Sequence, residues 1–217
     1  MNLAAAQEQM INQQLRTWDV LDNQVLSTVR DIGRENFVAA EYRQLAYVDM
    51  ELPIGHGEQM LNPKLEGRLL QALELGRTDS VLQIGAGSGY LSACLGHLAG
   101  NVLAYEQHED LAASAQQRLK DQGCASNVEI IADQFTADTS VAEFDAVAIC
   151  ASVARVTDTL TRTIKPGGRM FVVAGTVAYL EALLITRSAD GELRSESMFD
   201  TVVPWLSGFE PASQFTF

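Results

Sequence analysis

The fold is decided by residues 81–90, VLQIGAGSGY, in which an apolar run leads directly into three glycines at alternate positions. The run predicts a buried strand, and the glycines predict a tight turn into a helix that begins near Tyr90. Gly85 permits the sharp turn, Gly87 leaves room for a ligand close to the main chain, and Gly89 lets the helix start close to the strand. The same glycines would also be needed if the strand and the helix merely packed closely together and no ligand were bound.

The sequence on either side of this turn alternates between short apolar runs and helical stretches. This alternation predicts a Rossmann-like, doubly wound α/β fold, in which a mostly parallel sheet carries helices on both faces. The end of the chain differs, because Asp190-Gly191 is typical of a hairpin turn and predicts an antiparallel pair of strands. The expected strands are residues 81–84, 102–105, 128–131, 144–149 and 170–173, followed by hairpin strands at 180–186 and 199–203.

The first sixty residues predict a helical extension followed by a loop. Apolar residues near helical spacing predict a helix over residues 5–16, and Asp22 is suited to cap a second helix. We expect both helices to pack against the main sheet. Residues 42–62 show no sustained period and predict a structured loop, which ends where Asn62-Pro63 begins the next helix.

No linker rich in Pro, Gly or Ser divides the chain, so we expect one domain over residues 1–217. Within it, residues 1–62 supply the helical extension and the active-site loop. Residues 63–175 supply the cofactor-binding core, and residues 176–217 supply the C-terminal hairpin.

Charge and composition narrow the function classes. The chain has a formal net charge of −13 at pH 7, and its Lys and Arg residues occur singly. A phosphate backbone would be repelled, so no nucleic-acid partner is expected. The chain has no run of about eighteen apolar residues and no signal-like N-terminus, so we expect a cytoplasmic protein that does not enter a membrane. Its cysteines and histidines are scattered without metal-ligand spacing, so no metal site is expected.

Candidate cofactor contacts follow three successive strands. A dinucleotide fingerprint would need a glycine where Tyr90 stands, and a nucleotide triphosphate loop would need a Gly-Lys-Ser/Thr ending. Glu106 is placed to accept hydrogen bonds from ribose hydroxyls, and Asp133 to accept one from an adenine amino group. Each carboxylate alone could equally be a solvated charge at a strand end. Together they predict a cofactor crevice with the residues Gln83, Gly85, Ala86, Gly87, Ser88, Gly89, Glu106, Gln107, Asp133 and Gln134.

At these residues a family resemblance becomes specific. The chain is similar to protein-L-isoaspartate O-methyltransferases at AYVD (46–49), LPIGHG (52–57), NP (62–63), the glycine loop, FDA (144–146), PGGR (166–169) and VVP (202–204). The resemblance spans nearly the whole chain and implies a divergent class I methyltransferase that binds S-adenosyl-L-methionine. It also implies a repair enzyme, which methylates the side-placed carboxylate of L-isoaspartyl residues in a damaged protein or peptide substrate.

Three departures from the family pattern lie where function is decided. Family members usually read GQTISQP in the loop, whereas residues 57–63 read GEQMLNP, so Leu61 replaces the serine that helps hold the acceptor carboxylate. Gln83 replaces an acidic residue near the ammonium of the cofactor's methionine part. Residues 132–134, ADQ, replace the usual GDG and keep only the aspartate.

The candidate substrate loop is taken as His56, Gln59, Leu61 and Asn62. No proton-transfer residue is assigned, because a carboxylate acceptor is already ionised at pH 7. Leu61 either faces the acceptor or packs inward, and Gln59 is then the alternative donor. Two other functions remain compatible with this loop, namely methyl transfer to a different acceptor and a non-catalytic, cofactor-binding regulatory module. No oligomeric state is predicted.

Overall fold

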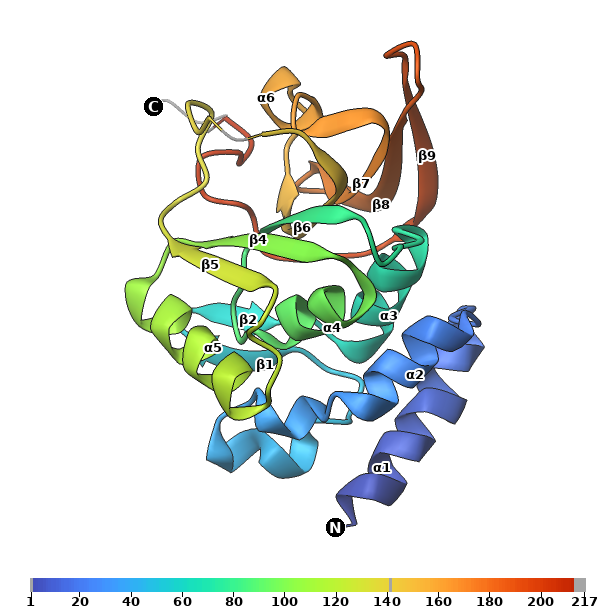
Figure 1. Cartoon of the computed structure of the whole chain (residues 1–217), viewed down its shortest axis with the longest axis vertical. Helices are drawn as coiled ribbons and strands as arrows, with labels where there is room; N and C mark the ends of the chain where they lie inside the picture. The colour runs from blue at the N-terminus through green and yellow to red at the C-terminus, as the bar shows by residue number, and fades with distance from the viewer. Residues whose placement is uncertain (1, 141, 213–217) are drawn as a thin grey trace.

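The computed structural model describes residues 2–140 and 142–212, and it contains a seven-stranded mixed sheet with the order β5-β4-β3-β6-β7-β8-β9 (Figure 1). The first five strands of that order run parallel, and β8 and β9 are antiparallel additions at one edge. The predicted Rossmann-like fold is therefore confirmed. The strands are β3 (Ser80–Ile84), β4 (Asn101–Glu106), β5 (Val128–Ala132), β6 (Phe144–Val153), β7 (Ile164–Thr176), β8 (Tyr179–Arg187) and β9 (Leu193–Asp200).

The sheet places a crevice where its strand order reverses. From β3 the chain goes outward to β4 and β5, and it then returns to the other side of β3 to form β6 and β7. The carboxyl ends of β3 and β6 are therefore neighbours with no crossing connection above them. This is the position at which open α/β sheets bind ligands.

The helices are arranged in two shells. Helices α3, α4 and α5 cover one face of the sheet, and the N-terminal helices pack outside α3 and α4 rather than on the sheet, which corrects our expectation (Figure 1). The reason is that the sheet face is already filled by the three inner helices. The bounds are α1 (Leu3–Met10), η1 (Ile11–Leu15), η2 (Arg16–Trp18), α2 (Asn23–Asp31), η3 (Arg34–Asn36), η4 (Ala40–Leu45), α3 (Pro63–Ala72), α4 (Tyr90–Leu98), α5 (Glu109–Asp121) and α6 (Asp158–Thr161).

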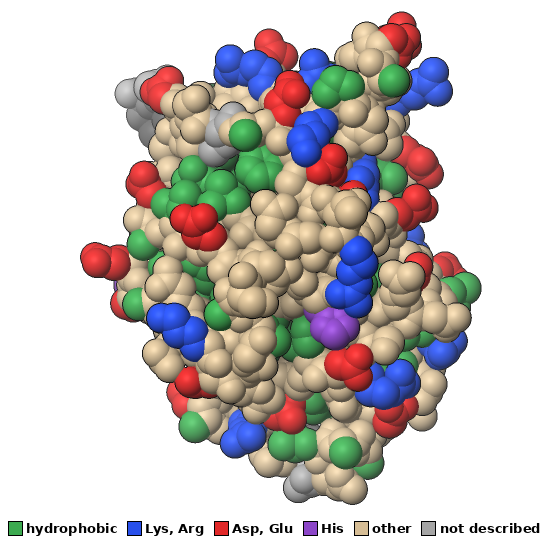
Figure 2. Space-filling model, in the orientation of Figure 1, with side chains coloured by type: hydrophobic (Ala, Val, Ile, Leu, Met, Phe, Trp, Pro, Cys, Tyr) green, Lys and Arg blue, Asp and Glu red, His purple; other side chains and the backbone are tan. Residues whose placement is uncertain are grey.

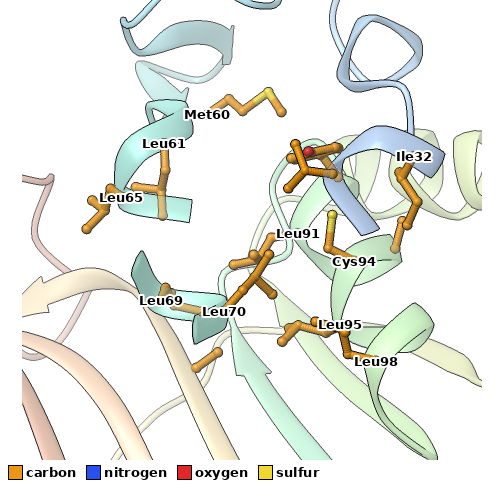
Figure 3. Close-up of a cluster of buried hydrophobic side chains, with 14 of the residues drawn as sticks. Ile32, Met60, Leu61, Leu65, Leu69, Leu70, Leu91, Cys94, Leu95 and Leu98 are labelled. Atoms are coloured by element: carbon orange, nitrogen blue, oxygen red, sulfur yellow. The ribbon is translucent and has the colours of Figure 1, made fainter. Parts of the chain in front are cut away.

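Helix α3 begins where the sequence predicts. The side chain of Asn62 accepts a hydrogen bond of 3.0 Å from the backbone N–H of Leu65, and Pro63 occupies the first turn. Leu65, Leu69 and Leu70 are buried in the same hydrophobic core as the leucines of α4 (Figure 3). Each buried leucine contributes roughly 1.5–3 kcal/mol, so this apolar stripe holds α3 beside the crevice.

Side chains alternate between the two faces of the sheet. Val81, Val102 and Ala146 point into the core under the three helices, whereas Leu82 and Val147 point into a smaller core on the opposite face. That opposite face is covered by the short α6 and by loop residues rather than by long helices. The crevice is therefore flanked by helices on one side and by irregular chain on the other.

Two segments differ from the predicted elements. Residues 42–62 contain the end of η4 and a small hairpin of β1 (Leu52–Gly55) and β2 (Glu58–Met60), instead of an irregular loop. Three consecutive residues with positive φ, from Gly55 to Gly57, form its turn. At the other end, β9 spans Leu193–Asp200, so the strand expected at 199–203 was placed too late. Val202 lies off the sheet and is 80% exposed.

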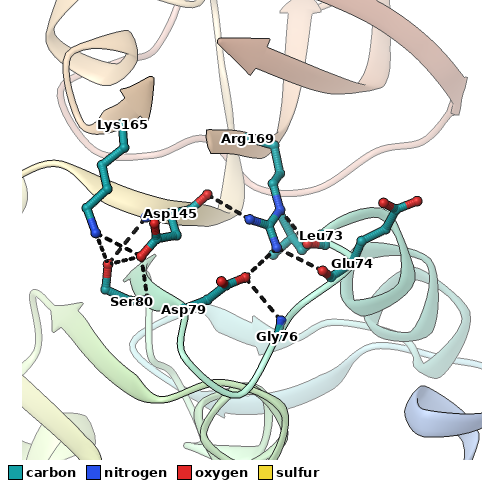
Figure 4. Close-up of polar contacts among 8 residues, drawn as sticks. All are labelled: Leu73, Glu74, Gly76, Asp79, Ser80, Asp145, Lys165 and Arg169. Carbon is teal, nitrogen blue, oxygen red and sulfur yellow. Dashed lines mark hydrogen bonds and ion pairs between the residues drawn. The ribbon is translucent and has the colours of Figure 1, made fainter. Parts of the chain in front are cut away.

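A polar network joins the strands at the edge opposite the crevice (Figure 4). Asp145 at the start of β6 accepts hydrogen bonds from Lys165 Nζ (2.8 Å) and from Ser80 Oγ and the Ser80 backbone N–H (2.6 and 2.8 Å). Arg169 of β7 donates to the Leu73 carbonyl (2.6 Å) and to Asp79 (2.6 Å). These contacts tie β3, β6, β7 and the end of α3 together, away from the candidate site.

No helix among the described residues has both the length and the apolar composition to cross a membrane. On the face that Figure 2 shows, Lys and Arg side chains are dispersed among acidic ones.

Candidate functional site

A single pocket extends from the carboxyl ends of the parallel strands to the β1–β2 hairpin. Its enclosed space is about 100 Å³, and about 790 Å³ lies within it when the solvent at its mouth is included. Of the predicted site residues, Gln59, Leu61, Gln83, Gly85, Ala86, Gly87, Ser88, Glu106, Gln107, Asp133 and Gln134 line it. The predicted residues His56, Asn62 and Gly89 do not.

The glycine loop forms the floor of this pocket. Gly85, Gly87 and Gly89 all have positive φ values, of 89°, 53° and 86°, which residues other than glycine rarely adopt. A Cβ atom at Gly89 would lie 3.0 Å from the Cβ of Ala115, so Gly89 allows α4 to start close to α5. This corrects our expectation that Gly89 serves the packing of helix against strand. A Cβ at Gly87 would lie 3.1 Å from Ile54 of the hairpin.

Glu106, the last residue of β4, orients its carboxylate by backbone hydrogen bonds. Its Oε2 accepts from the Gly87 N–H at 2.8 Å, and its Oε1 accepts from the His108 N–H at 3.1 Å. The side chain is 5% exposed. A carboxylate has about four lone-pair sites, so each oxygen can accept one further bond from a ligand hydroxyl.

Gln83 lies fully buried beneath the glycine loop. Its Oε1 accepts from Ser92 Oγ at 2.7 Å, and its Nε2 donates to the Gly85 carbonyl at 3.0 Å. The Nε2 also lies 3.5 Å from the Sγ of Cys150. Gln83 therefore organises the loop through both ends of its amide, and it brings no charge to the pocket.

The end of β5 supplies the opposite wall. Asp133 Oδ1 accepts from the Gln134 N–H at 2.8 Å, and Gln134 Nε2 donates to the Ser207 carbonyl at 3.2 Å. Phe135 packs edge-on against Tyr105, with ring centroids 5.5 Å apart. This aromatic wall was not expected from the sequence, although Phe135 directly follows Asp133 and Gln134 and is apolar.

The hairpin separates the four predicted substrate-loop residues. Gln59 and Leu61 line the pocket, and Leu61 is 8% exposed because it also packs into the core. His56 lies outside, where its Nε2 contacts Asp110 at 2.9 Å and its ring stacks on His108 at 4.1 Å between centroids. Asn62 caps α3 and donates to Glu51 at 2.8 Å. Two of the four predicted loop residues, Gln59 and Leu61, therefore form pocket wall, whereas His56 and Asn62 make contacts outside the pocket.

A buried ion pair lies behind the hairpin. Arg34 is fully buried and its Nε donates to Glu66 Oε2 at 3.0 Å. Its other two nitrogens donate to the carbonyls of Ala46, at 2.7 Å, and Leu61. Burial raises the pKa of Glu66 to about 7, against the opposing charge of Arg34.

Glu66 also lines the pocket, although it was not among the site residues expected from the sequence. Its position carried a signal, because Glu66 lies three and four residues before Leu69 and Leu70, on the apolar face of α3. Its partner Arg34 carried none, since the two residues are 32 positions apart.

The C-terminal segment closes the pocket. Ser152 of β6 donates its N–H to the Pro204 carbonyl, and Leu206 donates its N–H to the Ser152 carbonyl, both at 2.7 Å. This parallel bridge brings Trp205, Leu206 and Ser207 into the pocket wall. The run VVP at 202–204 was expected to form a strand, but it forms only the approach to this one-residue bridge.

Comparison with known proteins gives the family. The profile of protein-L-isoaspartate(D-aspartate) O-methyltransferase (PCMT) matches residues 5–206. The chain belongs to this family. The protein-L-isoaspartate O-methyltransferase of Koribacter versatilis is 35% identical over 206 residues, which cover 94% of this chain and 92% of that protein. The one of Brucella anthropi is 32% identical over 199 residues and covers 91% of each chain. The resemblance stated from sequence is confirmed.

Solved structures show the same fold. The PCMT crystal structure from Plasmodium falciparum, a complex with S-adenosyl-L-homocysteine, superposes with a TM-score of 0.79 at 18% identity and covers 95% of this chain and 99% of that one. A second protein-L-isoaspartate O-methyltransferase structure has the same TM-score at 20% identity, with coverage of 94% and 67%. The PCMT fold therefore extends over the hairpin and the C-terminal strands as well as the core.

Proposed function

We propose that this PCMT family member binds S-adenosyl-L-methionine and transfers its methyl group to the side-placed carboxylate of an L-isoaspartyl residue. The observation that carries the proposal is the continuity of one pocket, from the glycine loop and strand ends to the hairpin residues Gln59 and Leu61. A cofactor bound at the strand ends and an acceptor entering past the hairpin would meet inside it.

The cofactor half has groups that fit S-adenosyl-L-methionine. The carboxylate of Glu106 retains lone pairs for two ribose hydroxyls, and Asp133 is available to an adenine amino group next to the aromatic wall of Phe135. Side chains at Gly85 and Gly87 would narrow the loop where the cofactor passes. The S-adenosyl-L-homocysteine bound by the Plasmodium relative supports this assignment.

The pocket can promote transfer without a proton-transfer residue. When bound, the cofactor supplies a methyl group that is attached to a sulfonium sulfur. This sulfur is the leaving group, and it becomes a neutral thioether. The acceptor carboxylate is already ionised at neutral pH, so the protein's task is alignment and exclusion of water. Met60, Leu61 and Trp205 offer apolar surface for this. The new bond joins an acceptor oxygen to the methyl carbon, and the carbon–sulfur bond breaks.

A second candidate is methyl transfer to a different acceptor. It is favoured by one feature, because the acceptor side of the pocket presents the apolar side chain of Leu61. Such a side chain offers no hydrogen bond to an entering anion.

The test compares two peptides of one sequence, which differ only in an L-isoaspartyl or an L-aspartyl linkage. The protein is incubated with each peptide and methyl-labelled S-adenosyl-L-methionine, and base-labile methyl ester and S-adenosyl-L-homocysteine are measured. We expect both products with the isoaspartyl peptide and background with the aspartyl one. Cofactor binding without ester on either peptide would support another acceptor or a non-catalytic role instead.

A further inference from the structure

At the head of the glycine loop, the pocket lacks a negative charge that could pair with a cationic part of the cofactor. The methionine part of S-adenosyl-L-methionine carries an ammonium group, and the residue beneath the loop is the neutral Gln83. Its Oε1 is already engaged by Ser92, and its Nε2 by Gly85. A buried ammonium without an opposite charge would bind weakly.

Glu66, on α3, lines the same pocket as Gln83. Its side chain is 4% exposed, and its Oε2 accepts the hydrogen bond from Arg34. Its Oε1 has no hydrogen-bond partner within residues 2–140 and 142–212, and the residue lines the pocket. One oxygen of a nearly buried carboxylate is thus left for a ligand.

The charge of Glu66 also acts on Cys150, which lies beside the glycine loop. Burial raises the pKa of the Cys150 thiol to about 12, and the charge of Glu66 adds to the rise. Cys150 in turn lies 3.5 Å from Gln83 Nε2, and its Cβ is 3.4 Å from where a Cβ of Gly85 would be. Glu66, Cys150 and Gln83 all line the same pocket.

We propose that the carboxylate of Glu66 receives the ammonium of the cofactor's methionine part, and so supplies from α3 the charge that the end of β3 lacks. This inference rests on the proposed use of S-adenosyl-L-methionine. In this arrangement Glu66 bridges Arg34 and the ligand ammonium, one cation to each oxygen. Arg34 is the positioning residue, because its bonds to the carbonyls of Ala46 and Leu61 fix the guanidinium that orients Glu66.

The proposal predicts a proton linkage. Without ligand the pKa of Glu66 is about 7, and a bound ammonium would lower it. Binding would then release a proton below pH 7, so affinity rises with pH up to about 7 and levels off above it. The other groups facing Glu66 are Arg34 and the buried Tyr90, Cys94 and Cys150, and burial raises the pKa of the last three, which keeps them neutral in this range.

The test measures binding by calorimetry for two ligands that share the thioadenosine part. S-adenosyl-L-homocysteine has the amino-acid group, and 5′-methylthioadenosine lacks it. We expect Glu66→Gln to weaken the first about tenfold to a hundredfold and to leave the second within about twofold. In the unaltered protein, only the first should bind more tightly as pH rises from about 5.5 to 7, below the titration of a ligand amine. This pH series needs no variant and stands even if Glu66→Gln fails to fold.

A second variant tests whether the charge can be moved back. Adding Gln83→Glu to Glu66→Gln should restore most of the affinity for S-adenosyl-L-homocysteine. Equal losses for both ligands in Glu66→Gln, or no loss for either, would overturn the inference, because Glu66 would then only support Arg34. If the unaltered protein bound neither ligand, the proposed cofactor itself would be wrong, which is a different result.

Discussion

The two halves of the pocket are built by different means. The cofactor half consists of consecutive strand ends and one loop, in which the Gly87 N–H donates a hydrogen bond of 2.8 Å to the carboxylate of Glu106. The acceptor half is assembled from the β1–β2 hairpin and from the C-terminal segment at Trp205, whereas Glu66, which we propose for the cofactor, reaches the pocket from α3. The first half is a product of topology, whereas the second depends on particular side-chain contacts between distant segments. Substitutions should therefore act on cofactor affinity in the first half and on acceptor use in the second.

The largest effect is expected in the glycine loop. Gly87→Val puts a β-branched residue at φ 53° and a Cβ 3.1 Å from Ile54. The left-handed backbone conformation costs such a residue roughly 1–2 kcal/mol of conformational free energy. In addition, the added methyl groups would enter the space that we propose for the cofactor. We expect affinity for S-adenosyl-L-homocysteine to fall by about a hundredfold or more in calorimetry.

The matched control for that variant is Gly123→Val. Gly123 also has a positive φ, of 68°, but among the described residues no atom beyond its chain neighbours lies within 4 Å of its added Cβ, and it does not line the pocket. It should lower the melting temperature to a similar degree and leave affinity unchanged. A folded Gly87→Val protein with normal affinity would show that the loop is not the cofactor floor.

Glu106→Gln should have the next largest effect. The carboxylate accepts two backbone N–H bonds through two oxygens, whereas an amide would turn its own NH2 toward one of those donors. Affinity for S-adenosyl-L-homocysteine should drop about tenfold to a hundredfold, because hydrogen bonds to charged groups contribute roughly 1.5–3 kcal/mol. Glu109→Gln, three residues on and exposed, is the control and should bind normally. If Glu106→Gln and Glu109→Gln bound S-adenosyl-L-homocysteine equally well, Glu106 would not be a cofactor-binding residue.

The acceptor half is tested by Leu61→Ser. Leu61 lines the pocket and is nearly buried, so a hydroxyl there would give an entering carboxylate a donor that leucine cannot supply. We expect isoaspartyl methyl transfer per folded molecule to rise about tenfold, with cofactor affinity unchanged. Leu61→Ala removes the same bulk without adding a hydroxyl and should not show the rise. High activity in the unaltered chain that serine lowers would mean that another donor already serves.

The smallest effect should come from outside both halves, at Asp145. Burial acts to raise the pKa of Asp145, but the hydrogen bonds from Lys165 and Ser80 outweigh it and hold that pKa well below its usual range. A depressed pKa stabilises the folded state above the unfolded pKa of about 3.9, and the gain is lost as pH falls through the folded pKa. Asp145→Asn should cost about 1 kcal/mol of unfolding free energy in urea at pH 7.

The pH series identifies the cause of that loss. The difference between Asp145→Asn and the unaltered protein should shrink steadily below pH 4, and specific activity per folded molecule should stay the same at neutral pH. A penalty that persists at low pH would point to lost packing rather than to a lost charge.

Sequence predicted the cofactor half because its elements are regular. The short apolar run at residues 81–84, followed directly by glycines, is typical of a buried strand. Parallel strands bring their carboxyl ends to one edge of the sheet. The neighbours Glu106 and Asp133 therefore followed from counting strands. Even here the reason for Gly89 was wrong, since its close neighbour is Ala115 of α5, which no local pattern identifies.

The acceptor half could not be predicted for a physical reason. The strands of the β1–β2 hairpin are four and three residues long, and its turn places His56, a residue other than glycine, at positive φ. Neither feature produces a periodic signal. Arg34 and Glu66 meet only because α3 is folded against η3, and Trp205 reaches the pocket through one bridge to Ser152.

The stacked rings of His56 and His108 give the acceptor half a spectroscopic reporter. With centroids 4.1 Å apart and planes 10° apart, each imidazole lies in the ring current of the other, so the ring protons of both should be shifted upfield. His97, the third histidine of the chain, lies on α4 away from the pocket and serves as an internal reference. A movement of the hairpin would displace two of the three histidine signals in a proton NMR spectrum, so acceptor entry could be followed without a label.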